Sequence, residues 1–165
     1  AHSTVIVDGT DQLEAEGELI QFETFEDGGL MSAIVENISS GVTAIRTMIV
    51  VDIGSDGVII FDLIEGYSSS VHEYSTVLHG VGEFYFDGEI SKSRVEESQF
   101  PPWSYLRNLS RMNTSEDLRF SWSSTKDSLV NVIYPIHQNN SSFFFAEAPN
   151  NPPADFHSMA MIKSS

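Results

Sequence analysis

The stretch Val42–Gly80 reads VTAIRTMIVVDIGSDGVIIFDLIEGYSSSVHEYSTVLHG, and it decides the predicted fold. Its pattern predicts three consecutive strands. Two runs rich in β-branched residues, Ile45–Val51 and Val58–Ile64, are separated by the turn residues Gly54–Gly57. Both runs carry apolar side chains at odd and at even positions, which is typical of strands covered on both faces. We therefore expect the three strands of Val42–Gly80 as antiparallel neighbours near the middle of a sheet in a layered β structure.

One charged residue interrupts the second run. Asp62 needs a partner if its carboxylate is buried, and Arg46 on the neighbouring predicted strand is the obvious candidate. An edge position, with the carboxylate in solvent, explains Asp62 equally well.

The rest of the chain continues the β pattern. Short apolar or alternating segments end at turn residues such as Asp8-Gly9, Asp27–Gly29 and Asp87-Gly88. Further strands are predicted at Ser3–Asp8, Glu18–Phe25, Leu30–Glu36, Val81–Phe86, Leu118–Ser123, Leu129–Tyr134, Ser142–Ala148 and His157–Ile162. About ten short strands without an amphipathic helix predict an antiparallel β-sandwich. We expect one domain over residues 1–165, with the polar, poorly periodic residues 92–117 as a long loop excursion.

Composition limits the classes of partner. Twenty-four acidic and eight basic residues give a formal charge of −16, which argues against nucleic acid and against anionic membrane surfaces. No apolar run reaches the roughly 18 residues of a membrane-spanning helix. The chain has no cysteine, so disulfides and thiol chemistry are excluded.

Five N-x-Ser/Thr sequons favour an extracellular or periplasmic protein, although a surface rich in Ser and Asn also explains them; they begin at Asn37, Asn108, Asn113, Asn139 and Asn140. The first residues, AHSTVIVDG, already have the pattern of a strand. We therefore expect this sequence to be a segment of a longer protein.

Three blocks carry a family resemblance. They are Ala1–Gly9 (AHSTVIVDG) with Asp11-Gln12, then Ile45–Thr47 running to Phe61–Gly66 (FDLIEG), then His72–Tyr74 leading to Leu78–Gly80 (LHG). In this order they resemble the C-terminal β-sandwich region of the heparinase II/III-like polysaccharide lyases, a group that includes alginate lyases. The resemblance covers the first half of the chain.

The resemblance implies a two-part enzyme that cleaves uronic-acid polysaccharides by β-elimination. In that family an α-helical toroid carries the catalytic Tyr, His and Asn or Arg residues, and the β-sheets form a wall of the polysaccharide cleft. Several members hold zinc with an upstream His, an Asp and the His that corresponds to His2 here. Neither the toroid nor the upstream H-x-H-x-D motif is present in these 165 residues. We therefore expect this chain alone to be inactive, with zinc bound only in a complete enzyme.

Four residues are singled out for binding or packing. His2 is the candidate metal ligand, and an exposed terminal imidazole is the alternative. His79 and Trp103 are candidate substrate-binding residues; a hydrogen-bonded structural role is the alternative for His79. Trp122, within a predicted strand, is expected in the core.

Two functions from different classes follow. The first is the sheet domain of a heparinase II/III-like lyase, working with an upstream toroid on a uronate-containing polysaccharide. The second is a non-catalytic β-sandwich module that binds carbohydrate or assembles with other chains, and it fits the acidic charge better.

Overall fold

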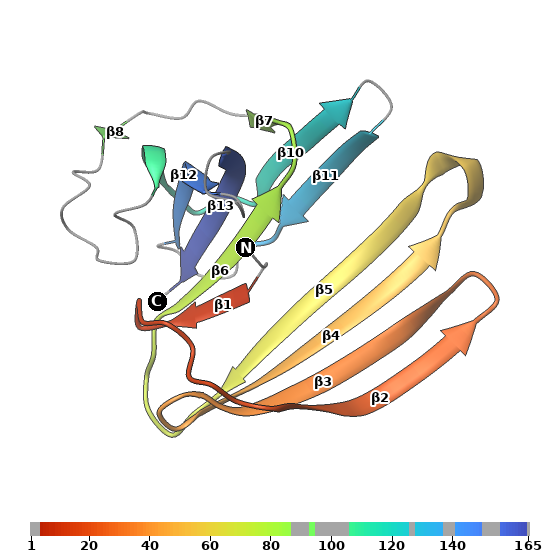
Figure 1. Cartoon of the computed structure of the whole chain (residues 1–165), viewed down its shortest axis with the longest axis vertical. Coiled ribbons are helices and arrows are strands. Elements are labelled where there is room, and N and C mark those ends of the chain that lie inside the picture. The colour runs from red at the N-terminus through yellow and green to blue at the C-terminus, as the bar shows by residue number, and fades with distance from the viewer. Residues whose placement is uncertain are drawn as a thin grey trace. The chain divides into compact units, whose positions relative to one another are not determined.

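The computed structural model of the chain (Figure 1) describes residues 4–86, 93–94, 106–125, 128–136, 141–149 and 156–164. These residues form thirteen strands in three antiparallel sheets, and their one helical element is the short 3-10 turn η1 (Gly54–Asp56). The predicted all-β antiparallel fold is confirmed, with more strands than the ten expected. The chain forms two compact units, Asp11–Val71 and Ala1–Thr10 with His72–Ser165. That both units belong to one domain stays a prediction.

The larger unit, called the sandwich unit, comprises Ala1–Thr10 and His72–Ser165. Its six-stranded sheet has the order β1-β6-β13-β12-β9-β8, and its three-stranded sheet has the order β11-β10-β7. The six strands are β1 (Thr4–Val7), β6 (Tyr74–Gly80), β8 (Ser93–Arg94), β9 (Arg107–Thr114), β12 (Ser141–Pro149) and β13 (Phe156–Ser164). The other three are β7 (Glu83–Phe86), β10 (Leu118–Thr125) and β11 (Ser128–Tyr134).

Both faces of the six-stranded sheet are buried near β12. Phe143 belongs to a core cluster with Phe120 and Trp122 of the three-stranded sheet, which makes these two sheets a sandwich. Phe144, the next residue, belongs to a separate cluster on the opposite face, with Met161 of β13. Because successive side chains of a strand point to opposite faces, the continuous apolar run of β12 fits a strand covered on both sides. Trp122 is 4% exposed, so its predicted core position is confirmed.

The sandwich requires a residue without a side chain on β6. A Cβ atom at Gly80 would overlap the indole ring of Trp122. Trp122 in turn contacts Phe84 and Phe120, with ring centroids 5.7 and 5.2 Å away. The indole therefore fills the space that any larger residue at position 80 would need.

The smaller unit, Asp11–Val71, is called the single-sheet unit. Its sheet has the order β2-β3-β4-β5, from β2 (Gly17–Phe25), β3 (Gly28–Ser39), β4 (Val42–Asp52) and β5 (Val58–Tyr67). Arg46 on β4 donates two hydrogen bonds to the Asp62 carboxylate on β5, at 2.8 and 2.6 Å. The predicted pairing of Asp62 with Arg46 is confirmed, and the edge position also holds, because Asp62 is an exposed residue of the edge strand β5.

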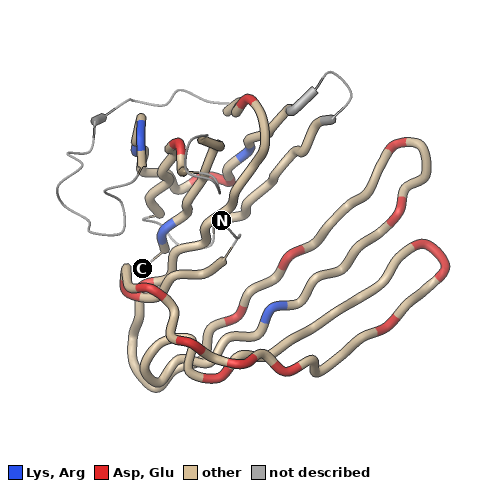
Figure 2. Tube along the Cα trace, viewed as in Figure 1, with Lys and Arg blue, Asp and Glu red and all other residues tan. Residues whose placement is uncertain are grey.

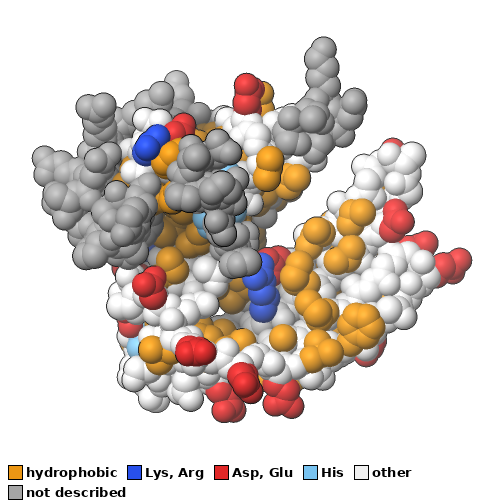
Figure 3. Space-filling view, in the orientation of Figure 1, with side chains coloured by type: hydrophobic (Ala, Val, Ile, Leu, Met, Phe, Trp, Pro, Cys, Tyr) orange, Lys and Arg blue, Asp and Glu red, His pale blue; other side chains and the backbone are white. Residues whose placement is uncertain are grey.

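Two expectations for Val42–Gly80 are wrong. The third predicted strand, β6, does not join β4 and β5 but lies between β1 and β13 in the sandwich unit. In addition, β5 is an edge strand, and Phe61 and Leu63 are 58% and 57% exposed. Figure 3 shows hydrophobic side chains at the surface along this sheet, and Figure 2 shows acidic residues spread over it. Apolar residues at odd and even positions of a strand therefore do not by themselves show that both faces of the strand are buried.

The predicted excursion over residues 92–117 contains regular structure. Ser93–Arg94 and Arg107–Thr114 form β8 and β9, and β9 pairs with β12. A polar strand of this kind gives little signal in the sequence, because its pairing partner lies far along the chain.

The contact between Gly80 and Trp122 gives a stability prediction. Gly80→Ala should destabilise the protein by about 1–3 kcal/mol, because the added methyl group forces the indole out of its packed position. Gly17→Ala is the matched control, since its Cβ would meet its nearest heavy atom at 3.5 Å, an ordinary contact. Urea unfolding followed by tryptophan fluorescence and circular dichroism measures both. A Gly80→Ala protein as stable as the wild type would contradict this account of the core.

Candidate functional site

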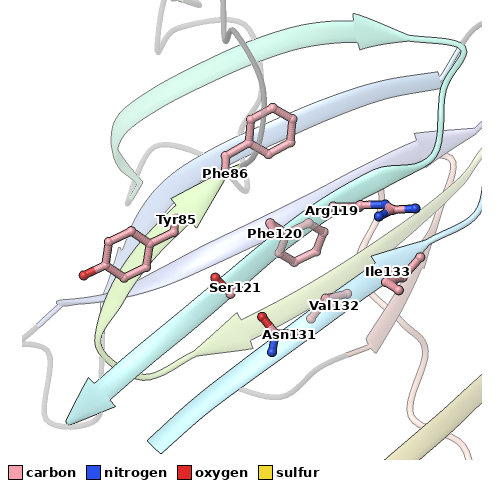
Figure 4. A pocket seen from close by; sticks show the side chains of 8 residues that line it. All are labelled: Tyr85, Phe86, Arg119, Phe120, Ser121, Asn131, Val132 and Ile133. Carbon is pink, nitrogen blue, oxygen red and sulfur yellow. The ribbon is translucent and has the colours of Figure 1, made fainter. Parts of the chain in front are cut away.

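An open groove of about 460 Å³ crosses the three-stranded sheet of the sandwich unit. Figure 4 shows its lining side chains, which come from all three strands: Tyr85, Phe86, Arg119, Phe120, Ser121, Asn131, Val132 and Ile133. Its volume falls within the usual range for ligand sites, about 300–1,000 Å³. The groove combines the exposed ring of Tyr85, the cation Arg119 and the uncharged polar groups of Ser121 and Asn131. Its remaining lining residues are apolar: Phe86, Phe120, Val132 and Ile133.

Strand register brings the polar groups of the groove into one row. Ser121 of β10 lies opposite Tyr85 of β7 on one side and opposite Asn131 of β11 on the other. Directly opposed residues of an antiparallel pair share a face, so these three side chains project from the same side of the sheet. Arg119, two residues from Ser121, shares that face and is exposed.

The alternation of β10 explains why this face is polar. Phe120 and Trp122 point into the sandwich core, so the residues that alternate with them, Arg119 and Ser121, must point away from it. The core thereby fixes the positions of Arg119 and Ser121.

The phenol of Tyr85 is held by a neighbour on its own strand. Its hydroxyl donates a 2.5 Å hydrogen bond to Oε2 of Glu83, and this bond to a carboxylate raises the pKa of Tyr85 above its usual value. Tyr85 is therefore a neutral phenol at physiological pH. Its ring is half exposed, which leaves it accessible to a ligand.

His79 lies away from this groove. It is directly opposite Met159, a member of the core cluster on the face of the six-stranded sheet that points away from β10. Its Nδ1 atom lies 2.6 Å from Nε2 of His157, with ring centroids 4.7 Å apart. Burial lowers the pKa of His157, so this imidazole favours its neutral form. His79 thus has the hydrogen-bonded position that was its structural alternative.

The other two predicted site residues, His2 and Trp103, lie outside the described residues. Within the described part of the chain, no group of three or more His, Cys, Asp or Glu side chains is placed to hold a metal ion. Tetrahedral zinc needs about four donors. The zinc site with His2 therefore stays a prediction.

A second polar cluster joins three strands of the six-stranded sheet. Asp8, which follows β1, accepts hydrogen bonds from the backbone N–H of Glu73 (2.9 Å) and pairs with His72 at 2.6 Å. Both interactions, the backbone bond first, lower the pKa of Asp8. Glu73 pairs in turn with Lys163 of β13 at 2.7 Å. These contacts satisfy the charged groups among themselves, which indicates a role in holding the sheet together.

Sequence reasoning did not find the groove. The alternation of Leu118–Ser123, with large apolar residues at every second position, was the available signal for the direction of Arg119 and Ser121. Tyr85 and Asn131 join them only through strand pairing, which the sequence alone does not specify.

No protein-family model and no curated protein matches this sequence. Among the residues that the structure describes, no helix is long and apolar enough to cross a bilayer.

The histidine pair predicts how stability depends on pH. The pKa of His157 is lower in the folded protein than the unfolded value of 6.5, so the unfolded chain binds more protons. The contribution of neutral His157 to the free energy of unfolding is therefore complete above about pH 6.5. It is lost as the pH falls towards the pKa of His157 in the folded protein. Urea unfolding at about pH 7.5, 6.5 and 5.5 should show the free energy of unfolding falling on acidification.

A substitution at His157 measures how much the His79–His157 pair contributes to the pH dependence of stability. His157→Gln should reduce the fall in stability between neutral and mildly acid pH, and the groove variant Ser121→Ala should keep the wild-type dependence. If His157→Gln shows the same pH dependence as the wild type, the pair does not carry the effect.

Proposed function

We propose that this chain is a polysaccharide-binding β-sandwich, and that it serves as the sheet domain of a heparinase II/III-like lyase. The observation that supports binding is the groove over the three-stranded sheet, with Tyr85, Arg119 and Asn131 on one face. The lyase assignment rests on the resemblance of three sequence blocks to that family.

The chemistry of the groove suits a sugar. The apolar face of a pyranose packs well on an aromatic ring, and Tyr85 offers an exposed ring whose hydroxyl is already occupied by Glu83. The amide of Asn131 and the hydroxyl of Ser121 can donate to and accept from sugar hydroxyls. Arg119 supplies a charge-assisted donor for a uronate carboxylate.

Net charge limits the kind of ligand. A formal charge of −16 repels a long polyanion, and salt screens that repulsion. The groove itself contains a cation, Arg119, and Glu83 lies beside it. We therefore propose a short stretch of uronate-containing polysaccharide as the ligand, with binding that strengthens as ionic strength rises from a very low value.

The alternative is a non-catalytic module that binds carbohydrate without any lyase partner. It uses the same groove, and the acidic composition favours a neutral sugar in that case. In both cases we expect no β-elimination by this chain alone, because a general base and a general acid must both reach the sugar. An extracellular or periplasmic site of action accompanies either function.

The binding proposal is tested by titrating the protein with alginate, hyaluronan and heparan oligosaccharides, and with a neutral cello-oligosaccharide. Tyr85→Ala should weaken binding by roughly two- to tenfold, the effect of losing one aromatic stacking contact. Arg119→Ala should weaken uronate binding and leave neutral-sugar binding unchanged. Calorimetry and NMR line broadening measure these affinities.

Tyr67→Ala is a matched control. Tyr67 is also 50% exposed and donates a hydrogen bond to a glutamate two residues away, Glu65, but it lies in the single-sheet unit. The Tyr67→Ala protein should therefore bind oligosaccharides with the same affinity as the wild type. Equal losses in Tyr67→Ala and Tyr85→Ala, or no binding by the wild type, would refute the groove as the site.

The lyase half of the proposal has its own test. The coding sequence upstream of Ala1 should encode a helical region that ends in an H-x-H-x-D motif. An unrelated upstream domain would favour the non-catalytic module. Ultraviolet absorbance of unsaturated uronate, produced by the purified chain alone, would show a catalytic base that this account lacks.

A further inference from the structure

The single-sheet unit exposes large apolar side chains on both faces of a four-stranded sheet. Five of the exposed side chains share one face, which is called the aromatic face: Phe25, Ile59, Phe61, Leu63 and Tyr67, between 43% and 58% exposed. A soluble protein rarely leaves a contiguous apolar surface of this kind without a binding role. The residues that border the aromatic face indicate what kind of partner would cover it.

Strand register defines the aromatic face. Phe61 of β5 lies opposite Ile49 of β4, and Ile49 lies opposite Leu30 of β3. Leu63 lies opposite Thr47, which lies opposite Ser32, and the two hydroxyls are 2.8 Å apart. The centre of this face is therefore apolar, and its internal polar groups already satisfy one another.

Acidic residues border the aromatic face on both edge strands. Glu23 of β2 lies opposite Leu30, and Glu65 of β5 lies opposite Ile45, so both carboxylates share the face with the apolar centre. Glu18 occupies the same face near the start of β2, opposite Ile34. An apolar centre with a charged rim is the usual anatomy of a protein interface.

A hollow of about 530 Å³ at the start of β2 adds to this charge. Its lining includes three carboxylates, those of Glu16, Glu18 and Glu36, together with the apolar residues Leu19 and Ile34. The whole segment 11–71 contains twelve acidic residues and one basic residue, Arg46. Arg46 lies on the other face, opposite Ala33 and Ile64, and is paired with Asp62.

We propose that the aromatic face docks a basic amphipathic segment of a partner protein. Its apolar stripe would pack on Phe61, Leu63 and their neighbours, and its Lys and Arg side chains would reach the carboxylates of the two edge strands. A second copy of this face is disfavoured, because it would bring two rims of the same charge together. Anionic lipids and acidic polysaccharides are disfavoured for the same reason.

This inference is independent of the polysaccharide groove. The groove lies in the sandwich unit, and the aromatic face lies in the single-sheet unit. Each can therefore be tested, and can fail, without the other.

The test uses the full chain and a synthetic peptide probe of about eighteen residues, with Leu at helical spacing and Lys elsewhere. A peptide with Glu in place of Lys, and a scrambled Lys/Leu peptide, are the controls. Fluorescence anisotropy at about 0.15 M ionic strength measures affinity. The amphipathic Lys/Leu peptide should bind at least tenfold more tightly than either control.

Paired variants locate the site. Phe61→Ser/Leu63→Ser should weaken binding of the Lys/Leu peptide about tenfold, because these two side chains are the most exposed apolar contacts that the face offers. Val50→Ser/Ile60→Ser is the matched control, since these two exposed residues lie opposite each other on the other face, and it should bind normally. Circular dichroism confirms that each variant is folded.

A second comparison of two double variants distinguishes the effect of the rim carboxylates from the effect of the overall charge. Glu23→Gln/Glu65→Gln should weaken binding more than Glu14→Gln/Asp56→Asn, which removes the same charge elsewhere on the single-sheet unit. Equal effects of the two pairs, or a larger loss from the Val50/Ile60 variant, would overturn the proposal. Formation of a dimer that Phe61→Ser/Leu63→Ser abolishes would show that a second copy covers this face instead.

Discussion

The aromatic core between the two sheets of the sandwich unit is the contact on which the rest of that unit depends. Trp122 and Phe120 of β10 can face Phe143 of β12 only because Gly80 leaves room for the indole. Once these side chains point inward, alternation sends Arg119 and Ser121 outward. The proposed sugar-binding groove is therefore a consequence of how the core is packed.

The single-sheet unit depends more on backbone pairing and less on the burial of apolar side chains. Its backbone groups are paired through the ladders of β2, β3, β4 and β5, and cross-strand contacts such as Arg46–Asp62 add to them. The described residues of Asp11–Val71 form one sheet with no second layer inside this unit, and β5 is exposed along almost its whole length. An apolar sheet without such a layer gains less from burial, and a partner that covers it would stabilise it.

The sequence predicted most of the strands, because alternation, β-branched runs and turn residues are local signals. It also predicted the Arg46–Asp62 pair, which a short hairpin brings together. It did not predict which apolar strands would be covered. Val58–Phe61 and Phe143–Phe145 are both continuous apolar runs, but one is on an exposed edge strand and the other is on a central strand. That difference is set by pairing between distant segments, such as β6 with β13, which a local pattern does not specify.

The candidate sites show the same limit. Tyr85, Ser121 and Asn131 are ordinary surface residues in the sequence, and only strand register brings them together. A substrate-binding role for His79 stays a prediction, and the structure places its ring against His157, from a strand far along the chain. Single residues were therefore predicted more successfully in the core, where Trp122 followed from alternation alone.

The central claim is that the two units differ in how their apolar side chains are buried. Amide hydrogen exchange followed by mass spectrometry measures the consequence directly, because protection reflects the free energy of local opening. Amides of β12 and β13 should exchange slowly, at rates set by unfolding of the sandwich unit, and amides of β5 should exchange much faster. Equal protection of β5 and β13 in the isolated chain would contradict the claim.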